Sequence, residues 1–280
     1  MISPATKLTA VIGDPVTHSL SPFLHNAIYA DEQVDAVMLA FGNPSIENLV
    51  TAIRTLPIHL AAVTMPHKQT IMPLLDHIDD TARDIGAVNT VVNREGELHG
   101  FNTDVVGIAT ALKNVPLKGA KVLLIGAGGA ARTVAYFLKR EGADMLCYNR
   151  DRAQADGLIA TFGGTFIDAQ VFGNVQFDLI INATPIGMSA KGGSASGGKP
   201  PTDITPFPEE YIKQGSAVFD LVYSPLETKL LASAKRRGAR PISGLTMFLA
   251  QGLEQERLWL GKSFDEKRYE ALLEKAVQER

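Results

Sequence analysis

The stretch KVLLIGAGGAA, residues 121–131, decides the fold of this chain. Residues 121–125 are a short, mostly apolar run, which is typical of a strand buried in a parallel sheet. A glycine-rich turn, residues 126–130, follows at once. It leads into a helical pattern whose apolar positions 131, 134, 135 and 138 share one face. The stretch therefore predicts a strand, a tight turn and a helix in direct succession.

A Gly-x-Gly-x-x-Ala turn between a strand and a helix is typical of dinucleotide-binding domains. Its glycines permit the tight turn and the close approach of a pyrophosphate, and the helix N-terminus offers free N–H groups and a partial positive charge. The alternative is an ordinary tight connection between the two elements. The residues predicted to contact a dinucleotide here are Gly126, Ala127, Gly128, Gly129 and Ala130.

The end of the next predicted strand, residues 145–148, bears on the choice of dinucleotide. Asn149 and Arg150 stand at this end, with Asp151 and Arg152 close behind. NAD sites place a carboxylate here against the ribose hydroxyls, whereas arginine suits the 2′-phosphate of NADP. Arg150 and Arg152 therefore favour NADP. NAD or dual use stays open because Asp151 would repel a 2′-phosphate, and Arg152 is equally interpreted as a solvated charge at a helix start.

Short apolar runs alternate with helical patterns on both sides of this motif. Strands are predicted at residues 8–12, 37–41, 58–65, 88–92, 97–101, 121–125, 145–148, 179–182 and 217–221. Residues 68–75 are expected to be helical. Because repeated alternation is typical of parallel sheets with right-handed crossovers, we expect a two-lobed α/β protein. It would pair an N-terminal α/β substrate domain with a Rossmann-type, doubly wound dinucleotide-binding domain.

The composition agrees with two lobes and excludes several classes of protein. The chain has 280 residues, 45% of them hydrophobic and 20% charged, and a formal net charge of −3, which argues against a broad nucleic-acid or membrane surface. The single cysteine, Cys147, excludes an internal disulfide and a multi-cysteine metal site, and we expect no metal. We find no signal-peptide pattern and no run of about 20 apolar residues. We expect a cytoplasmic protein that handles a small molecule, as a monomer or homodimer.

Polar residues gather at predicted strand ends of the N-terminal lobe. They are HSLSP at 18–22, TMPHK at 64–68, Asn89, and NTD at 102–104. Ligands of open α/β sheets bind beyond the carboxyl ends of the strands. Hydroxyl, amide, ammonium and carboxylate groups converging there suit a polyhydroxylated, anionic ligand.

Each of these residues also has a structural interpretation. Ser21 and Asp104 are good helix caps, with Pro22 placed at the first helical position behind Ser21. Lys68 is a possible solvated lysine at a helix start, although a cation is slightly unfavourable there. The histidines of this region have no metal-ligand partners at recognisable spacing, and we interpret them as structural or surface residues.

The order of these motifs resembles that of the shikimate/quinate dehydrogenase family. The motifs that carry the resemblance are HSLSP at 18–22, VTMPHK at 63–68, GAVNT at 86–90, NTD at 102–104, the turn at 126–131 and Asn149-Arg150. The resemblance covers residues 8–261. It implies an oxidoreductase that reversibly reduces 3-dehydroshikimate to shikimate, usually with NADPH.

The resemblance also implies roles for single residues. Lys68 matches the catalytic lysine of the family and Asp104 its partner aspartate. Positions that contact the substrate are matched by Ser19, Ser21, Thr64, Asn89, Tyr223 and Gln251. Positions at the cofactor, beyond the glycine turn, are matched by Asn149, Arg150, Thr184, Leu221, Gly244 and Met247.

The motifs divide the chain into functional parts. We expect a substrate-binding domain at residues 1–104, an NAD(P)-binding Rossmann domain at 105–242, and C-terminal helices at 243–280 that return to the first domain with Gln251. Residues 189–202, rich in glycine and serine, are expected to form a mobile surface loop. Lys68 would stabilise charge developing on the C3 oxygen and donate the proton, while Asp104 orients it.

One position departs from the family pattern. Biosynthetic members commonly read Asn-Val-Thr where this chain reads Ala62-Val63-Thr64. The missing side-chain hydrogen bond costs about 1–3 kcal/mol if its partner stays unpaired, and the space gained would suit a ring with an additional hydroxyl, such as quinate. A quinate/shikimate dehydrogenase using NAD or both cofactors is therefore an alternative.

Two further alternatives fit the sequence less well. A folate-linked methylene dehydrogenase/cyclohydrolase shares a two-lobed layout and a catalytic lysine, but the Ser-x-Ser-Pro and Asn-Thr-Asp motifs favour the shikimate family. A non-catalytic module that senses a metabolite or cofactor would not need both Lys68 and Asp104.

Overall fold

The computed structural model describes residues 2–17, 19–188 and 204–279, so His18 and the loop expected at 189–202 lie outside the described residues. The described chain forms two compact units. The first contains residues 2–104 and 249–270, and the second contains residues 105–188, 204–248 and 271–279. The functional division at 104 and 242 proposed from the motifs stays a prediction.

The first unit is built on a six-stranded mixed sheet in the order β2-β1-β3-β5-β6-β4. Its strands are β1 (Lys7–Gly13), β2 (Ala36–Gly42), β3 (Leu60–Val63), β4 (His77–Ile78), β5 (Thr90–Arg94) and β6 (Glu97–Phe101). Its helices within residues 2–104 are α1 (Ser21–Asp31), α2 (Ile46–Thr55), the 3₁₀ turn η1 (Met72–Leu74) and α3 (Asp80–Ile85). Strand β5 runs antiparallel to both β3 and β6, whereas β1, β2 and β3 are parallel. The parallel pairing predicted from the strand–helix alternation therefore holds for β1 with β2 and β3 and for β4 with β6, but not for β5.

Two local predictions for this unit are also wrong. Residues 68–75 do not form an α-helix, since only η1 is helical there and Pro73 inside the segment prevents an α-helix from continuing. Helix α1 begins at Ser21 itself, with Leu20 as the N-cap residue, so Ser21 is not the cap. The side chain of Ser45, by contrast, caps α2 by accepting the N–H of Asn48 at 3.2 Å.

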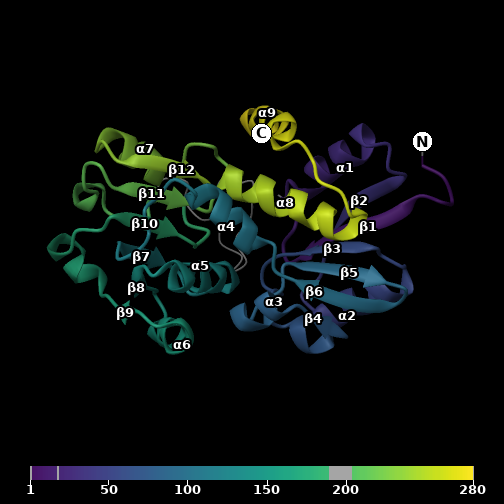
Figure 1. Ribbon diagram of the computed structural model, residues 1–280, viewed down its shortest axis with the longest axis horizontal. Helices are drawn as coiled ribbons and strands as arrows, with labels where there is room; N and C mark the ends of the chain where they lie inside the picture. Colours follow the sequence, from purple (N-terminus) through teal and green to yellow (C-terminus); the bar gives the residue numbers. More distant parts are fainter. Residues whose placement is uncertain (1, 18, 189–203, 280) are drawn as a thin grey trace. The chain divides into compact units, whose positions relative to one another are not determined.

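The second unit is built on an all-parallel sheet of six strands in the order β12-β11-β10-β7-β8-β9, a sequence that can be followed in Figure 1. Its strands are β7 (Lys121–Ile125), β8 (Asp144–Tyr148), β9 (Thr165–Phe166), β10 (Leu179–Asn182), β11 (Ala217–Asp220) and β12 (Arg240–Ser243). Counted from β7, this is the doubly wound order 3-2-1-4-5-6, with the topological switch point between β7 and β10. The predicted Rossmann-type fold is confirmed.

Helices and short 3₁₀ turns connect these strands. They are α4 (Asp104–Leu112), α5 (Gly129–Glu141), α6 (Arg152–Phe162), η2 (Ala169–Asn174), η4 (Glu209–Tyr211) and α7 (Lys229–Arg236). Helix α8 (Gly244–Leu260) begins in the second unit and continues into the first, and α9 (Glu266–Gln278) spans the boundary at residue 270.

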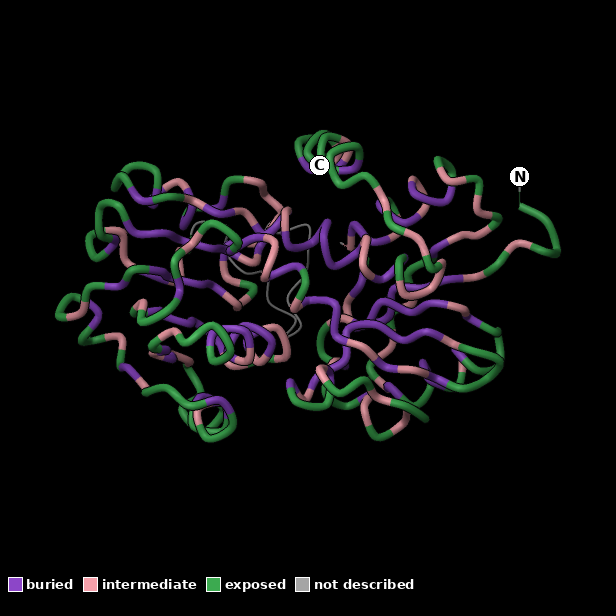
Figure 2. Tube along the Cα trace, viewed as in Figure 1, coloured by how far each residue is buried: buried purple, intermediate pink, exposed green. Residues whose placement is uncertain are grey.

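Each unit has apolar clusters of its own. In the first, Ala61, Val63 and Val91 of the sheet pack with Leu49 and Ile53 of α2. The second contains two clusters, one on each side of β7, because Leu124 belongs to one and Leu123 to the other. Figure 2 shows buried residues concentrated along the strands. Burial on both faces explains why β7 reads as a continuous apolar run.

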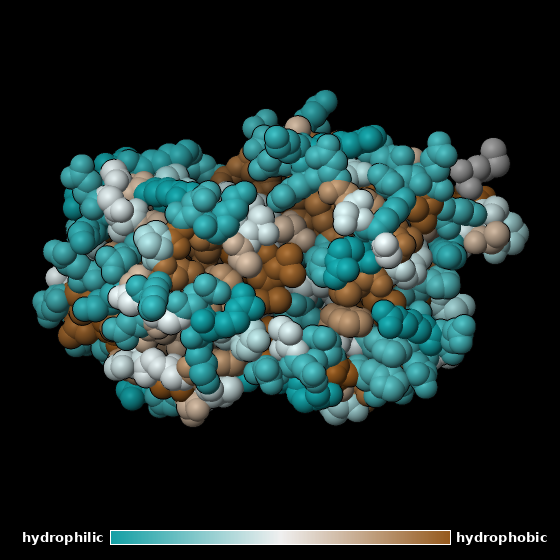
Figure 3. Space-filling view, viewed as in Figure 1, coloured by the Kyte–Doolittle hydropathy of each residue, from teal (hydrophilic) through white to brown (hydrophobic). Residues whose placement is uncertain are grey.

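Hydrophilic residues make up most of the face seen in Figure 3, with smaller apolar areas among them. Among the described residues, we find no helix with the length and apolar character needed to cross a membrane.

Candidate active site

The first sheet brings most of the predicted polar residues of its unit to one edge. The N–H of Val63, at the end of β3, donates to the Asn89 carbonyl at 2.7 Å, and the N–H of Asn89 donates to the Phe101 carbonyl at 3.0 Å. Because β5 is antiparallel to β3 and β6, Asn89 precedes its strand while Thr64 and Asn102 follow theirs. Residues distant in sequence thus share the edge at which ligands of α/β sheets bind.

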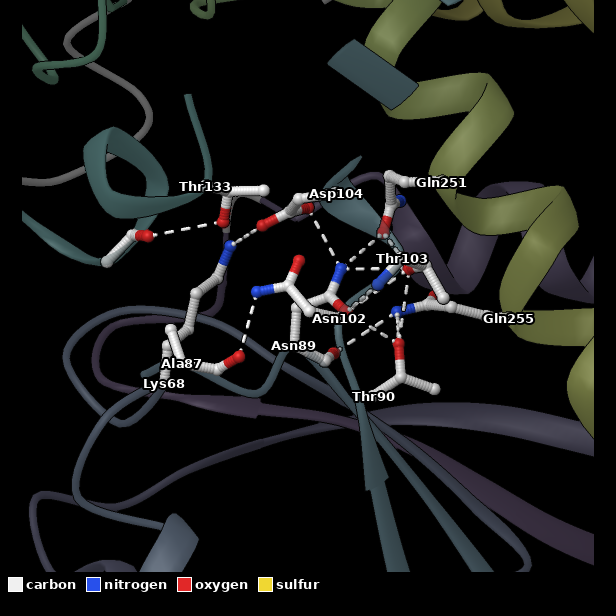
Figure 4. A network of polar contacts seen from close by, with 11 residues as sticks. Lys68, Ala87, Asn89, Thr90, Asn102, Thr103, Asp104, Thr133, Gln251 and Gln255 are labelled. Atoms are coloured by element: carbon white, nitrogen blue, oxygen red, sulfur yellow. Dashed lines mark hydrogen bonds and ion pairs between the residues drawn. The ribbon is translucent and has the colours of Figure 1, made fainter. Parts of the chain in front are cut away.

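Lys68 and Asp104 form an ion pair at this edge, as Figure 4 shows. The Lys68 Nζ donates to the Asp104 Oδ2 over 2.6 Å, and the two side chains are only 15% and 6% exposed. Such charge-assisted bonds are roughly twice as strong as neutral ones, and partial burial protects them from screening by salt. Asp104 is the first residue of α4, where the positive end of the helix dipole favours a carboxylate. The pair therefore holds an ammonium group at a fixed position.

Asn89 connects this pair to the rest of the network. Its Nδ2 donates to the Asp104 Oδ1 and to the Thr103 Oγ1, each over 2.9 Å, and to the Gln251 Oε1 over 3.2 Å. Its Oδ1 accepts the Thr103 backbone N–H at 2.7 Å and the Thr90 hydroxyl at 2.8 Å. Asn89 is 2% exposed. Its amide therefore fixes the orientation of the Asp104 carboxylate, which in turn holds Lys68.

Helix α8 supplies two glutamines to the same network. Gln251 accepts from Asn89, and the Nε2 of Gln255, one helical turn further on, donates to the Asn89 carbonyl at 3.2 Å and to the Thr90 Oγ1 at 3.0 Å. Gln255, Thr90 and Thr103 were not predicted as site residues. The spacing of Gln251 and Gln255 at i and i+4 places both on one helix face, and this was the available sequence signal.

The other residues predicted to contact the substrate make contacts of their own within the chain. The Ser19 hydroxyl donates to the Ser21 Oγ over 3.2 Å, so these two lie together before and at the start of α1. The Thr64 N–H donates to the Ile12 carbonyl at 2.9 Å, which places Thr64 beside the end of β1. Tyr223, in the second unit, packs its ring at 4.6 Å from that of Phe248.

The glycine turn of the second unit has the geometry that a dinucleotide requires. Gly126 has φ +115°, and a Cβ there would lie 3.0 Å from Thr184 Cγ2 and 3.1 Å from the Ala183 carbonyl oxygen. Gly128 is the N-cap of α5 and has no side chain with which to cap it, and a Cβ on Gly128 would meet nothing within 4 Å among the described residues. A helix N-terminus that begins at such a glycine fits a pyrophosphate group. Residues 126–130 therefore fit a bound dinucleotide.

The predicted residues at the end of β8 are partly engaged with one another. Asp151 caps α6, accepting the N–H groups of Ala153 at 3.0 Å and Gln154 at 3.3 Å, so its carboxylate is occupied by the helix. Arg152 pairs with Asp156 at 2.8 Å and lies over the Phe166 ring at 4.0 Å.

Asn149 and Arg150 differ in their contacts. The Asn149 Nδ2 donates to the Asp151 carbonyl at 2.9 Å. Arg150 is exposed, and no contact within the described chain occupies its guanidinium. Arg150 can therefore bind an anion without giving up an existing ion pair, whereas Arg152 would have to leave Asp156.

Three of the other predicted cofactor residues follow the ends of parallel strands in the second sheet. Thr184 follows β10, Leu221 follows β11 and Gly244 follows β12, and these three strands lie side by side, with β10 next to β7. Gly244 has no room for a side chain, because a Cβ would collide with the Leu221 carbonyl. Met247, on α8, is 8% exposed, and its carbonyl would lie 2.5 Å from a Cβ on Gly107.

A buried polar network supports two of these loops. Asp220 accepts the Asn182 Nδ2 at 2.8 Å and the Thr228 hydroxyl at 2.6 Å, and the Asn182 Oδ1 accepts the Thr184 hydroxyl at 2.7 Å. Burial raises the pKa of the Asp220 carboxyl to about 6, although its hydrogen bonds act in the opposite direction. Of its members only Thr184 was predicted, because Asn182, Asp220 and Thr228 look in sequence like ordinary residues at strand ends and helix starts.

A second network that sequence analysis missed is buried in the first unit. Glu256 of α8 accepts from the Tyr29 hydroxyl at 2.7 Å and is paired with His25 Nδ1, and Tyr29 contacts the Thr9 hydroxyl at 2.9 Å. Burial, and next the charge of Glu256, raise the pKa of Tyr29. The interpretation of His25 as structural agrees with this. His67, also buried, has its Nε2 2.8 Å from the Asn43 carbonyl.

Together the two units define a class of protein. A doubly wound domain with a glycine turn at a helix N-terminus, in a chain that also holds a partly buried lysine–aspartate pair in a polar network, is typical of dinucleotide-dependent oxidoreductases.

Comparisons with known proteins identify the family within this class. The family profile described as "Shikimate dehydrogenase substrate binding domain" matches residues 11–91, and that described as "Shikimate / quinate 5-dehydrogenase" matches residues 109–188. The chain belongs to the shikimate dehydrogenase family, as the motifs predicted.

Individual relatives align over almost the whole chain. The shikimate dehydrogenase (NADP(+)) of Maridesulfovibrio salexigens is 40% identical over 273 residues, covering 96% of this chain and 97% of that protein. A shikimate dehydrogenase crystallised with NADP+ has a TM-score of 0.88 at 34% identity, covering 99% and 98% of the two chains. The enzyme of Thermus thermophilus in complex with NADP(H) and shikimate has a TM-score of 0.82 at 34% identity, covering 95% and 97%.

Proposed function

We propose that this chain is an oxidoreductase that interconverts shikimate and 3-dehydroshikimate with NADP. The observation that carries the proposal is the Lys68–Asp104 pair, held at 2.6 Å inside a buried amide network. A merely structural ion pair at the surface would contribute about 0–1 kcal/mol and would not need such support. The relatives named above, which align over almost the entire chain, are shikimate dehydrogenases.

The protein residues would act on the reacting oxygen of the substrate. The Lys68 ammonium would donate a hydrogen bond to the C3 oxygen, stabilise the negative charge that develops there during reduction, and give up a proton to it. In the oxidative direction the uncharged amine would accept that proton. Asp104 keeps the Nζ in place, and Asn89 keeps the Asp104 carboxylate from rotating.

The substrate hydroxyls and carboxylate require further polar groups. We assign Ser19, Ser21, Thr64, Asn89, Tyr223 and Gln251 to these contacts, by their match to the family motifs. Several of these side chains are hydroxyls or amides that can both donate and accept, which suits a ring carrying several hydroxyl groups.

The dinucleotide would be held at the carboxyl edge of the second sheet. We assign Gly126–Ala130 and the α5 N-terminus to the pyrophosphate, Asn149, Arg150 and Arg152 to the 2′-phosphate end, and Thr184, Leu221, Gly244 and Met247 to the remainder. When bound, the nicotinamide supplies the hydride in one direction and accepts it in the other. Arg152 would have to leave Asp156, a small cost because exposed i,i+4 pairs contribute only about 0.3–0.5 kcal/mol.

Quinate is the second candidate substrate, and Ala62 is the observation that favours it. Ala62 is buried in β3, paired with Thr90 and Val11, and offers no side-chain donor or acceptor. A substrate group that meets an amide in other members would meet a methyl group here. That change weakens discrimination between rings with different hydroxyl patterns.

One grid of assays tests the proposal. Shikimate and quinate are each offered with NADP+ and with NAD+, and formation of the reduced dinucleotide is followed by absorbance. We expect the highest kcat/KM for shikimate with NADP+. A preference for quinate would overturn the substrate assignment, activity with NAD+ alone would overturn the role of Arg150 and Arg152, and ligand binding without any turnover would favour the sensing module.

A further inference from the structure

Three side chains able to bind a metal ion meet on the solvent face of the first sheet. His77 begins β4, and Glu97 and His99 are the first and third residues of β6. His77 is in register with His99 in the parallel β4–β6 pair, and Glu97 lies two residues before His99, so all three side chains share one face. Leu98, between them, is fully buried on the opposite face.

The geometry brings their ligand atoms close together. The rings of His77 and His99 stack with centroids 4.5 Å apart and an angle of 20° between their planes. The His77 Nε2 lies 3.1 Å from the Glu97 Oε2. One nitrogen or oxygen from each residue can be chosen so that all three lie within 4.8 Å of one another. To share one ion, the side chains would turn so that these atoms point at it from the distances of about 2.0–2.2 Å that Zn²⁺ requires.

The chemistry and surroundings suit a borderline divalent ion. Two imidazoles with one carboxylate are a usual donor set for Zn²⁺, and the side chains of His77 and Glu97 are 54% and 65% exposed, which leaves coordination positions for water.

We propose that His77, Glu97 and His99 form a binding site for a Zn²⁺-like divalent transition-metal ion. The ion would link β4 to β6 across the edge of the sheet. Strand β4 has only two residues and pairs with β6 alone in this sheet. A cross-strand metal bridge would therefore hold the edge strand more firmly than its few backbone contacts do. This site shares no residue with the lysine–aspartate pair, and its residues were not among those predicted from the sequence to bind a ligand.

Calorimetric titration of the untagged full chain with zinc chloride, in buffer without chelators, tests the proposal. We expect one Zn²⁺ per chain. Affinity should fall by about 10-fold or more in His77→Ala and His99→Ala, and less in Glu97→Gln, since even indirect partners of a metal change affinity by about 10–100-fold. The control His59→Gln, at another partly exposed histidine of the same unit, should bind as the native chain does. Zn²⁺ should also raise the thermal unfolding midpoint of the native chain and not that of His99→Ala.

Two results would overturn the site. One is the absence of binding by the native chain, and the other is unchanged stoichiometry and affinity in His99→Ala. The unfolding midpoints without metal show whether each variant folds. If His99→Ala does not fold, the other two variants decide the question. The proposal is then refuted when Glu97→Gln and His77→Ala both bind Zn²⁺ as tightly as the native chain does.

Discussion

Replacing Asn89 by alanine probes the network on which the site depends. The amide of Asn89 donates to Asp104, Thr103 and Gln251 and accepts the Thr103 N–H. In Asn89→Ala the Thr103 N–H and the Asp104 Oδ1 both lose these bonds while they remain buried. Each buried group left unsatisfied costs about 1–3 kcal/mol, so the two together give an expected loss of about 2–6 kcal/mol. This is a large part of the stability of about 5–15 kcal/mol that proteins usually have.

A charged substitution of the same shape separates hydrogen bonding from packing. Asn89→Asp keeps the acceptor for the Thr103 N–H but places a second carboxyl 2.9 Å from the Asp104 Oδ1, where Asn89 had a donor. The protonated form of the introduced carboxyl restores one donor, and the ionised form repels Asp104. The introduced carboxyl therefore binds a proton more tightly in the folded protein than in the unfolded chain. The folded state of Asn89→Asp loses stability as the pH rises and this proton is released. The deficit of Asn89→Asp should be smaller at pH 5 than at pH 8, whereas that of Asn89→Ala should not depend on pH.

The assay is equilibrium unfolding in urea at both pH values, with Asn48→Ala, at an exposed position of α2 in the same unit, as the control. The control should change the free energy of unfolding by less than about 0.5 kcal/mol. A loss below about 1 kcal/mol for Asn89→Ala, or an equal deficit of Asn89→Asp at both pH values, would refute the reasoning, because buried groups without partners cost at least that much.

Three further predictions concern the buried networks and the glycine turn. Glu256→Ala should lose about 3–5 kcal/mol of unfolding free energy, because it leaves His25 and Tyr29 without their buried acceptor. Glu256→Gln keeps an acceptor oxygen and should lose much less, and urea unfolding measures both losses. Asp220 has its pKa raised from 3.8 to about 6, so its contribution to stability is complete below pH 3.8 and is lost as the pH rises through 6. In Asp220→Asn the thermal midpoint should therefore vary less between pH 4 and pH 7, and an unchanged pH profile would contradict this. Gly128→Ala should weaken NADP+ binding measured by calorimetry while the unfolding midpoint stays near native, whereas Gly126→Ala should also lose about 1–3 kcal/mol of stability because of its backbone strain.

The sequence predicted the parts of the fold that local patterns determine. The run 121–131 is a strand, a turn and a helix because its apolar positions and glycines act within a few residues. The helix expected at 68–75 failed for an equally local reason, since Pro73 interrupts it.

The contacts that the sequence did not predict depend on how strands far apart in the chain pair with one another. The antiparallel pairing of β5 with β3 places Asn89 between Thr64 and Asn102, and no local pattern in the sequence predicts that pairing. The β4–β6 register likewise brings His77 against His99. Their sequence separation shows no metal-ligand spacing.

The hydrogen-bond partners of single side chains were also not predictable from the sequence. Asp151 was expected to oppose a 2′-phosphate, and its carboxylate also caps α6. Asp151 at a helix start is also a capping signal, so both interpretations were available from sequence. Only the structure shows which atoms the carboxylate meets.

The central claim is that Lys68 acts on the reacting oxygen instead of merely supporting the fold. The most direct measurement is kcat for shikimate oxidation with NADP+ in Lys68→Ala, beside the Kd for shikimate and the unfolding midpoint of the same variant. General acid–base groups contribute about 10²–10⁴-fold to rate. We predict a fall in kcat of that size, far larger than the change in the Kd for shikimate, in a variant that still unfolds cooperatively. Near-native turnover in Lys68→Ala, or a loss of turnover explained entirely by weaker shikimate binding, would contradict the account.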